Sequence, residues 1–419
     1  MQHGNDGVGL LTMRSGPGPL PAAGPRFEDE RLIKGKGRFV ANIEAPDALV
    51  AWFVRSPFAN GALTGVDTAF AQDTDGVVAI YTAADLDLPD QPATRPAGVP
   101  GMERPMLARD RVAFVGEAVA LVVAESAAQA EDAAGLVFVE VDPEPAVVDV
   151  VEAAKDETII HPGAGTNVAF EQRVVSGPEP PDGLIDVTVN VEHPRLAPSP
   201  LEGMAVLATP INGGLHIHVG VQSPHELGRQ IAGIVGLDES AIRITSPDVG
   251  GAFGMKRFYP EYAIVAKAAM MLGRPVRWVQ PRREFFLSGS HGRGQRHEVT
   301  LSADSEGRVH AARFRLLTST GAYPHRGVMI ALFSRLVASG LYDIPHVDFE
   351  ILAAVTNQTP TAPYRGAGRP EAALAIERAM DALAARLDMD PAELRRRNMV
   401  AELPHETATG AKLDSGDYR

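Results

Sequence analysis

A short strand, a glycine-rich loop and a helix follow directly on one another between residues 242 and 272. The apolar positions Ile242 and Ile244 run into Gly250-Gly251-Ala252-Phe253-Gly254, and residues 260–272 then have a helical composition. Glycines at such a junction allow backbone N–H groups to approach an oxyanion or a phosphate closely. A chain that alternates strands and helices in this way is expected to form an α/β (α+β) fold. The loop by itself is explained equally well by a tight turn.

The same alternation predicts two domains. A compact α/β unit is expected over residues 26–149, a linker over residues 150–165 and a second, larger domain over residues 166–419. Residues 1–25 are rich in glycine and proline and are expected to form a disordered lead-in. The polar stretch 407–419 is expected to carry no closing element of its own.

Hydrophobic periodicity places individual elements within these domains. Strands are expected at residues 48–54, 77–82, 117–125, 136–141, 275–280, 313–320 and 349–356, and at the alternating positions Leu215, Ile217, Val219 and Val221. Helices are expected at residues 126–134, 227–234 and 260–272, after Pro370, and after Asp390.

A second Gly-rich segment, Ala362-Pro363-Tyr364-Arg365-Gly366-Ala367-Gly368-Arg369, also stands just before a helix. In such a place a guanidinium group can be aimed at an anion or at a polarised carbonyl. Arg365, between Tyr364 and Gly366, is the candidate for that role. Arg369 is instead expected to pair with Glu371 at the surface.

Other polar groups are open to a functional or a structural interpretation. Gln222-Ser223-Pro224-His225 lies where a strand ends and a helix begins, which is where α/β folds place ligands. His225 taken alone is more often a capping or packing residue than a catalyst. His216 and His218 share one strand face, and without a third ligand they are expected to be solvated rather than to bind a metal. The basic cluster Arg282-Arg283-Glu284 with His291-Gly292-Arg293-Gly294-Gln295 either holds a phosphate-rich cofactor tail or forms a structural network beneath a sheet.

The composition removes several classes of site. Without a cysteine among its 419 residues, the chain has no disulfide, no cysteine-ligated iron–sulfur cluster or zinc, and no cysteine nucleophile. A net charge of -14 argues against duplex nucleic acid or an anionic membrane as a partner. No apolar run approaches the ~20 residues of a membrane span, and a cytoplasmic protein is expected.

A series of motifs occurs in a fixed order: Arg55-Ser56-Pro57, Val115-Gly116-Glu117-Ala118-Val119-Ala120, Gln222-Ser223-Pro224-His225, the glycine loop, His291-Gly292-Arg293, Gly321-Ala322-Tyr323, Tyr364-Arg365-Gly366-Ala367-Gly368-Arg369-Pro370-Glu371 and Asp414-Ser415-Gly416-Asp417. Together they resemble the molybdopterin-binding large subunit of the xanthine dehydrogenase, aldehyde oxidase and aerobic carbon monoxide dehydrogenase family. The resemblance implies that residues 26–149 are an a/b hammerhead domain. It implies that residues 166–419 are the first molybdenum-cofactor-binding domain.

The resemblance also implies roles for single residues. Gln222 would lie beside the oxo ligand of molybdenum, and Arg365 would orient the substrate and stabilise developing negative charge. Molybdenum would be held through the pterin and not by side chains. The implied cofactor-binding residues are Gln222, Gly250, Gly251, Ala252, Phe253, Gly254 and Arg365, and the implied substrate-pocket residues are Arg257, Tyr364 and Gly366.

The implied reaction is hydroxylation of an electron-poor carbon in a small N-heteroaromatic or aldehyde-type substrate, with water as the oxygen source. The implied cofactor is molybdopterin with molybdenum, in the cytosine dinucleotide form usual in bacterial members. Electrons would leave through 2Fe-2S clusters and FAD on partner subunits, which agrees with the lack of cysteine in this chain.

Two departures from the family pattern narrow the substrate. The copper-containing carbon monoxide enzymes carry a cysteine directly after the Tyr-Arg pair, where this chain has Gly366. Purine-oxidising members carry a glutamate after the lysine that follows the glycine loop, where this chain has Arg257 after Lys256. Carbon monoxide and xanthine are therefore not expected. We hypothesise that Arg257 favours a substrate with a carboxylate or another acceptor.

Family members of full length continue past the position of Asp414-Ser415-Gly416-Asp417 into a second cofactor-binding domain. That second half supplies the glutamate general base and further pterin contacts. The 419 residues of this chain contain no equivalent of that glutamate or of those contacts. A second molybdopterin-binding chain is therefore expected to complete the site. The alternatives are a truncated or structural subunit without a working site, and a nucleotide- or sugar-binding protein that uses the glycine loop alone.

Overall fold

The computed structural model describes residue 24 and residues 26–91 and 99–418. The chain divides into two units, Met1–Arg38 and Phe39–Arg419. The described part of the first unit contains α1 (Asp29–Ile33). The predicted lead-in over residues 1–25 lies outside the described residues apart from Gly24. All of the candidate site residues belong to the second unit.

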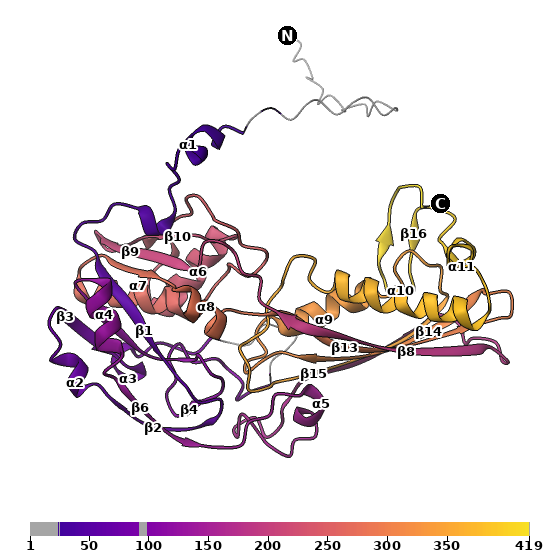
Figure 1. Ribbon diagram of the computed structural model, residues 1–419, viewed down its shortest axis with the longest axis horizontal. Helices are drawn as coiled ribbons and strands as arrows, with labels where there is room; N and C mark the ends of the chain where they lie inside the picture. The colour runs from indigo at the N-terminus through magenta and orange to yellow at the C-terminus, as the bar shows by residue number, and fades with distance from the viewer. Residues whose placement is uncertain (1–23, 25, 92–98, 419) are drawn as a thin grey trace, which may run out of the picture. The chain divides into compact units, whose positions relative to one another are not determined.

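The second unit contains a mixed seven-stranded sheet and a five-stranded sheet (Figure 1). The seven-stranded sheet has the order β11 (Ile242–Thr245), β10 (Gly214–Val219), β9 (Ala205–Ile211), β12 (Val276–Val279), β1 (Leu49–Arg55), β5 (Ala118–Ala124) and β3 (Val77–Tyr81). At its centre β1 pairs in parallel with β12, with Leu49 opposite Val276. Strands from both predicted domains therefore share one sheet.

Helices cover both faces of this sheet. α7 (Pro260–Leu272) packs on the face that carries Phe53 and Leu121, whereas α4 (Ala127–Ala134) packs on the opposite face against Val122. Because side chains alternate along a strand, β5 is buried at every position only if both of its faces are covered, as observed. α6 (Pro224–Val235) packs against α7 and β11 and completes the layer beside the glycine loop.

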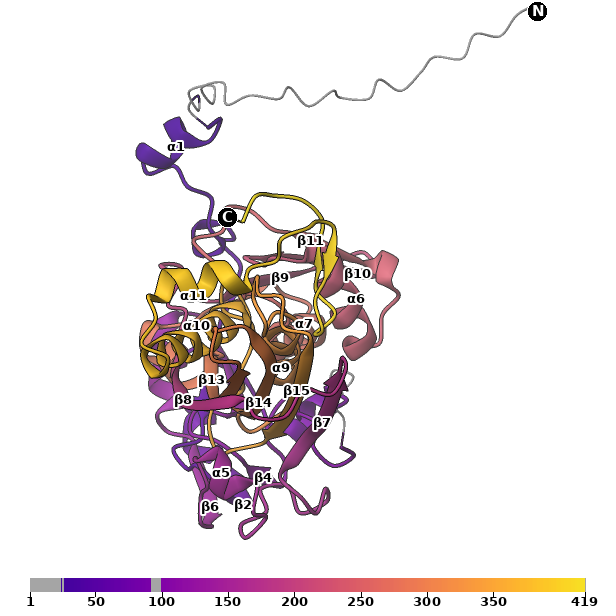
Figure 2. The same cartoon turned by 90° about the vertical axis from the view of Figure 1, so that its right-hand side faces the viewer.

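The five-stranded sheet has the order β7 (Val168–Ser176), β15 (His346–Ala354), β14 (Val309–Ser319), β13 (Gly292–Ala303) and β8 (Ile185–Leu196). α9 (Gly327–Leu336) and α10 (Arg369–Arg386) cover one face, and α5 (Val150–Ala153) packs on the other (Figure 1 and Figure 2). Along β14, Phe314 and Leu316 are buried beneath the helices while Arg313 and Arg315 are exposed. This alternation is the pattern of a sheet that has one polar face.

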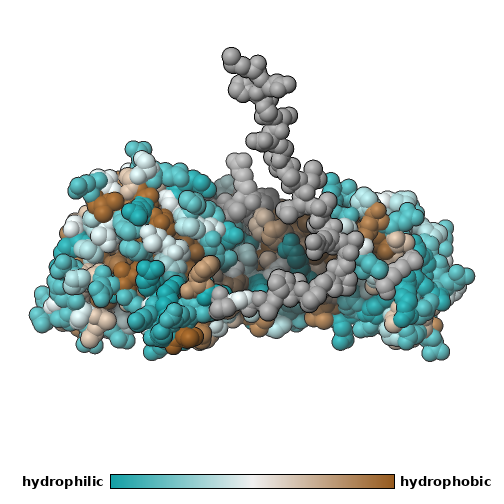
Figure 3. Space-filling model, turned by 90° about the horizontal axis from the view of Figure 1, so that it is seen from above, coloured by the Kyte–Doolittle hydropathy of each residue, from teal (hydrophilic) through white to brown (hydrophobic). Residues whose placement is uncertain are grey.

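The remaining elements are short. They comprise the three-stranded sheet β4 (Arg111–Val112), β2 (Gly61–Asp67) and β6 (Phe138–Pro143), the hairpin β16 (His405–Glu406) and β17 (Lys412–Leu413), the helices α2 (Ala69–Gln72), α3 (Ala83–Leu86), α8 (Arg282–Ser288) and α11 (Pro391–Asn398), and the 3-10 turns η1 (Val40–Asn42) and η2 (Glu239–Ala241). Within the described residues, no helix has the length and apolar character needed to cross a membrane. On the face drawn in Figure 3, hydrophilic residues predominate and hydrophobic ones form separate small spots.

The predicted fold class is confirmed. α7 has the predicted bounds. The observed β3 and α4 differ from the predicted ranges by one residue at one end, and β1 and β5 differ by one residue at both ends. One prediction is wrong, because residues 407–419 do contain a closing element. Lys412–Leu413 pairs with His405–Glu406 in a short hairpin that the polar composition of the segment did not indicate.

Candidate functional site

The glycine loop follows β11 and ends before α7. Gly251, Phe253 and Gly254 have positive φ angles of 93°, 51° and 105°. A Cβ atom on Gly254 would lie 2.5 Å from the carbonyl oxygen of Pro363, so the two loops can approach this closely only at glycine. Within the described chain, the N–H groups of Gly251, Ala252 and Phe253 make no hydrogen bond. Consecutive free N–H groups beside left-handed residues form a concave anion-binding surface.

Gln222 contacts this loop directly. Its side-chain Oε1 accepts a hydrogen bond from the N–H of Gly254 at 3.0 Å, and its own N–H donates to the carbonyl oxygen of Lys256 at 2.9 Å. Gln222 lies between β10 and α6, at the end of the sheet where the glycine loop begins, and its side chain is exposed. The structure thus brings Gln222 and Gly254 together.

A buried ion pair supports the glycine loop from behind. Lys256 is 0% exposed, and its Nζ lies 2.7 Å from Oε2 of Glu202. The same oxygen accepts the N–H of Gly250 at 2.8 Å. Burial lowers the pKa of Lys256, and the carboxylate of Glu202 opposes that shift. Nothing in the sequence indicated Glu202, because the pair joins residues that are far apart in the chain.

Arg365 lies in the turn before α10. Gly366, Ala367 and Gly368 all have positive φ angles, of 100°, 43° and 87°. The side chain of Arg365 is exposed, and its guanidinium has no hydrogen-bond or ionic partner in the part of the chain that the structure describes. Such a group is available to an anion or to a carbonyl oxygen.

Residues 362–369 form a loop that we call the arginine loop, and Arg293 holds its backbone in place. Its Nη1 and Nη2 donate to the carbonyl oxygens of Tyr364 at 3.3 Å and of Arg365 at 2.9 Å. Its guanidinium also lies 4.7 Å from the centroid of the Tyr364 ring. Glu371, which is 0% exposed in the first turn of α10, pairs with Arg293 at 3.3 Å. Arg293 therefore fixes the position from which the Arg365 side chain extends.

The predicted surface pair of Arg369 and Glu371 is wrong. Glu371 is buried and is taken by Arg293. Arg369 instead donates to the carbonyl oxygen of Gly366 at 3.3 Å and lies 5.4 Å from the centroid of the Phe333 ring. The helix turns Glu371 inward, which the close spacing of the two residues in the sequence did not indicate.

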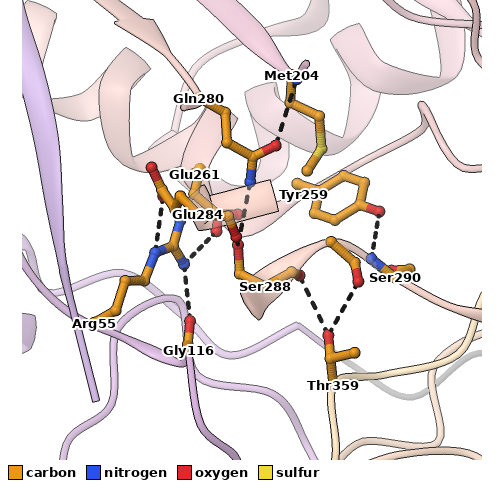
Figure 4. Close-up of polar contacts among 11 residues, drawn as sticks. Arg55, Gly116, Met204, Tyr259, Glu261, Gln280, Glu284, Ser288, Ser290 and Thr359 are labelled. Carbon is orange, nitrogen blue, oxygen red and sulfur yellow. Dashed lines mark hydrogen bonds and ion pairs between the residues drawn. The ribbon is translucent and has the colours of Figure 1, made fainter. Parts of the chain in front are cut away.

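Of the first part of the basic cluster, Glu284 belongs to a buried network at the junction of β1, α7 and α8 (Figure 4), whereas Arg282 and Arg283 are exposed. Arg55 lies 2.7 Å from Glu261, and it also pairs with Glu284 and donates to the carbonyl oxygen of Gly116. The side chains of Arg55, Glu261 and Glu284 are each less than 10% exposed. The observed contacts of Glu284 are those of a structural network, which is the second of the two interpretations of the basic cluster.

This network continues toward the arginine loop. The hydroxyl of Thr359 donates to the carbonyl oxygens of Ser288 and Gly289, and the N–H of Ser290 donates to the hydroxyl of Tyr259, as Figure 4 shows in part. Thr359 lies six residues before Arg365, and Tyr259 lies five residues after Gly254. The network therefore connects the segments that carry the two loops.

Arg257 follows Lys256, whose carbonyl oxygen accepts the N–H of Gln222, and it belongs to a cluster of three charges. Its Nη1 is 3.1 Å from Glu226, and the other oxygen of Glu226 is 3.3 Å from Arg326. Burial and the charge of Arg257 lower the pKa of Arg326. Two guanidinium groups and one carboxylate leave a net positive charge here. The sequence did not single out Arg326, because nothing in its local pattern connects it to Arg257.

The contacts of His216, His218 and His225 do not indicate a metal site. His225 is exposed in the first turn of α6. The rings of His216 and His218 lie 4.2 Å apart, and Nε2 of His216 bonds to the hydroxyl of Thr245 at 2.8 Å. Among the residues that the structure describes, no group of three His, Cys, Asp or Glu side chains is arranged to hold a metal ion.

A cavity of about 520 Å³ lies away from this site, between β1, α4 and α8. Its lining includes Trp52, Val137 and Leu287, and it contains no residue of the glycine loop or the arginine loop. The candidate site is instead a surface formed by two touching loops, on which Gln222 and Arg365 are exposed. Its free N–H groups, its amide and its unpaired guanidinium fit a ligand that has several oxygen or nitrogen acceptors.

Two family models match the chain. Residues 182–399 match the molybdopterin cofactor-binding domain, and residues 34–145 match the aldehyde oxidase and xanthine dehydrogenase a/b hammerhead domain. The first match contains the glycine loop and the arginine loop, and the second contains Arg55. The predicted combination of these two domains is confirmed.

Curated relatives and solved structures agree with these models. The chain is 35% identical to the nicotine 6-hydroxylase large subunit of Paenarthrobacter nicotinovorans over 407 residues, which are 94% of this chain and 50% of that protein. It is 32% identical to the carbon monoxide dehydrogenase large chain of Hydrogenophaga pseudoflava, over 93% of this chain and 52% of that one. It resembles the crystal structure of quinoline 2-oxidoreductase from Pseudomonas putida 86 with a TM-score of 0.87 and 33% identity, over 94% of this chain and 52% of that one.

The chain spans about half the length of these relatives. It spans 88% of the nicotinate dehydrogenase large molybdopterin subunit of Eubacterium barkeri, to which it is 27% identical over 395 residues. The matches to both domain models and to these large subunits all point to the same group of molybdenum-containing oxidoreductases. The chain therefore belongs to the molybdopterin-binding large-subunit family of xanthine dehydrogenase, aldehyde oxidase and carbon monoxide dehydrogenase.

Proposed function

We propose that the chain is the molybdopterin-binding subunit of a molybdenum hydroxylase that acts on an electron-poor carbon of an N-heteroaromatic or aldehyde-type substrate. The observation that carries this proposal is the contact between the two loops. The free N–H groups next to Gly254 and the unpaired guanidinium of Arg365 belong to segments that touch where Gly254 meets Pro363. The names of the nicotine and quinoline relatives support an N-heteroaromatic substrate.

The roles of the residues follow from their contacts. When bound, the molybdopterin cofactor supplies a two-electron oxidation in which water provides the oxygen. The free N–H groups of Gly251, Ala252 and Phe253 would bind acceptor atoms of the cofactor. The amide of Gln222, fixed through its Oε1, keeps its NH₂ group available as a donor. Arg365 would stabilise negative charge that develops on the substrate.

We further propose that a second molybdopterin-binding chain completes the site and supplies the general-base glutamate. The lengths of the relatives support this arrangement, because a molybdopterin subunit of nearly this length exists in Eubacterium barkeri. Electrons would pass to 2Fe-2S and FAD subunits, and the cofactor would be the cytosine dinucleotide form. These partners are proposed from the family to which the chain belongs.

Metal and pterin analysis of the complex, purified from its source with its associated chains, tests the proposal. We expect stoichiometric molybdenum and a pterin nucleotide, together with oxidation of at least one member of a panel of quinolines, pyridines, aromatic aldehydes and purines. If molybdenum and pterin are missing even when the associated chains are present, the catalytic proposal fails. A non-catalytic structural or assembly subunit would then be the better description.

The substitution Arg257→Glu tests the substrate preference. A glutamate at this position would add a second negative charge beside Glu226, so substrates that carry a carboxylate should bind less well. We expect kcat/KM for aromatic acids to fall about tenfold relative to purines and neutral heterocycles, which corresponds to about 1.4 kcal/mol. Arg274→Glu is the control, because Arg274 has a similar exposure of 40% but pairs with Glu125. If the Arg257→Glu variant kept the wild-type substrate preference, Arg257 would not be the residue that favours substrates with a carboxylate.

A further inference from the structure

Arg326 is the more deeply buried of the two arginines that share Glu226. Its side chain is 13% exposed, whereas that of Arg257 is 37% exposed. Each arginine takes a different oxygen of the carboxylate, since Oε1 lies 3.3 Å from Nη2 of Arg326 and Oε2 lies 3.1 Å from Nη1 of Arg257. Neither arginine has another ionic partner in the part of the chain that the structure describes. The cluster therefore keeps one positive charge that no described carboxylate pairs with.

The backbone that carries Arg326 is packed against the arginine loop. Arg326 immediately precedes α9, and a Cβ on the next residue, Gly327, would lie 2.3 Å from Oγ1 of Thr361. Further along α9, the hydroxyl of Ser334 donates to the carbonyl oxygen of Gly368 at 3.1 Å. Because packing this close leaves little room for the helix to shift, the side chain of Arg326 starts from a fixed position next to the arginine loop.

The segment before Arg326 is held as well. The hydroxyl of the buried Tyr323 donates to Oε1 of the buried Glu117 at 2.6 Å, and Nε2 of His161 bonds to the carbonyl oxygen of Ala322 at 2.6 Å. Glu117 lies within the a/b hammerhead match and Tyr323 within the molybdopterin cofactor-binding match. Arg326 is therefore placed by its backbone and not only by its ion pair with Glu226.

Arg257 keeps free donors because Arg326 takes one oxygen of Glu226. Nη1 is the atom of Arg257 that contacts Glu226, and its Nε and Nη2 have no partner among the described residues. A guanidinium presents its N–H groups as a planar fork that matches the two oxygens of a carboxylate. Such donors are present in the segment that directly follows the glycine loop and bonds to Gln222 through Lys256.

We propose that Arg326 is a specificity-determining residue, which occupies half of Glu226 and thereby leaves Arg257 able to bind one carboxylate of the substrate. This inference rests on the proposed function and narrows its substrate to N-heteroaromatic rings that carry a single carboxylate. Arg326 acts through Glu226 and Arg257 and not through contact with the reacting atoms.

The charge balance explains why the second arginine matters. Without Arg326, both oxygens of Glu226 would be available to the fork of Arg257, and the pair would be neutral. A neutral pair offers little to offset the desolvation of a substrate carboxylate, whereas a cluster with one surplus positive charge attracts it. The same surplus charge gives no advantage to an uncharged ring of the same shape.

The test uses matched ligands that differ in one charge, namely pyridine and quinoline carboxylates and the corresponding carboxamides. Isothermal titration calorimetry of the purified complex gives their dissociation constants, and kcat and KM are measured for the compounds that the complex oxidises. We expect the wild type to bind the carboxylates at least about tenfold more tightly than the carboxamides. Arg326→Met should reduce this preference to about twofold or less, with kcat for the carboxamides nearly unchanged.

Two further variants separate charge from structure. The double variant Arg326→Met/Glu226→Gln again has one unpaired positive charge, so it should recover the preference for carboxylates. Glu226→Gln alone raises the surplus to two positive charges and should strengthen the preference, which keeps the inference testable if Arg326→Met does not fold. A merely structural role of Arg326 predicts neither result.

Arg395→Met is the matched control. The side chain of Arg395 is 22% exposed and pairs with two carboxylates, those of Glu377 and Asp381 on α10. None of these residues belongs to the glycine loop or the arginine loop. The control variant should therefore keep the wild-type preference for carboxylates.

Each other outcome would overturn the inference. Equal affinity of the wild type for carboxylates and carboxamides would mean that the cluster does not select a charge. An unchanged preference in Arg326→Met, or a double variant that recovers nothing, would remove Arg326 from substrate selection. The proposed function fails separately, when the wild-type complex itself contains no molybdenum and no pterin.

Discussion

Replacing Arg55 with methionine is expected to destabilise the chain by about 3–5 kcal/mol, because it leaves two buried carboxylates without their cation. Glu261 and Glu284 are each less than 10% exposed and both pair with Arg55. Arg55 lies on β1, Glu261 in the first turn of α7 and Glu284 in α8, so the substitution also removes a contact that joins these three elements. Urea denaturation measures the change in the free energy of unfolding.

The loss of stability in Arg55→Met should depend on pH and should be smaller at low pH than at neutral pH. In the wild type, burial raises the pKa of Glu284, and for Glu261 the charges of Arg55 and Arg104 outweigh burial and lower the pKa. Without Arg55, we expect both carboxyl groups to have a folded-state pKa above the unfolded value, because the charge of Arg55 is the largest influence that lowers the pKa of each. The penalty is then present at neutral pH and disappears as the pH falls through the raised pKa values.

Arg55→Lys is the matched control, because it keeps the charge but replaces the three donor nitrogens of the guanidinium with a single ammonium group. It should destabilise the chain less than Arg55→Met does. An equal penalty for Arg55→Met at about pH 5 and pH 8 would contradict this explanation, since the cause would then not be the uncompensated carboxylates.

Replacing Glu202 with glutamine is expected to have an effect of similar size. Lys256 is 0% exposed and Glu202 is its ionic partner, so the variant leaves a buried ammonium group without a counter-charge, which costs about 3–5 kcal/mol. The double variant Glu202→Gln/Lys256→Met should recover part of the loss, because it removes both charges. Thermal or urea denaturation of both variants measures this difference.

Glu125→Gln is the comparison for the Glu202 variant. Glu125 pairs with Arg274 at the surface, where both side chains are at least 40% exposed, and exposed pairs contribute little. If Glu202→Gln were no more destabilising than Glu125→Gln, Lys256 would not depend on Glu202 for its charge.

The elements of the fold that the sequence predicted are those with local signals. α7 begins at Pro260 and ends before Gly273, whose φ of 63° explains why glycine stands there. β5 is an unbroken apolar run because both of its faces are covered. The pairing of β1 with β12 had no such signal, because it joins Leu49 to Val276 across more than half of the chain.

The candidate site also combines residues that have a local signal in the sequence with contacts that have none. Gln222, the glycine loop and Arg365 stand out because their residue types and their places between elements are unusual for plain packing. The contacts that position them have no signal in the sequence. Arg293 meets Glu371 across 78 positions and Lys256 meets Glu202 across 54, so these pairs exist only after the strands and helices have packed. The expected pair of Arg369 and Glu371 was wrong for the same reason, since proximity in the sequence did not determine which way Glu371 faces.

The molybdenum content of a Gly254→Ala variant tests most directly the claim that the two touching loops hold the cofactor. A Cβ at Gly254 would lie 2.5 Å from the carbonyl oxygen of Pro363, and the φ of 105° is strained for alanine, so the loops must separate. Gly233→Ala is the control, because Gly233 lies in α6 with no atom within 4 Å of its added Cβ. We predict that the complex purified with Gly254→Ala retains its fold but loses most of its molybdenum and pterin, while Gly233→Ala keeps both. Wild-type molybdenum content in Gly254→Ala would contradict the account.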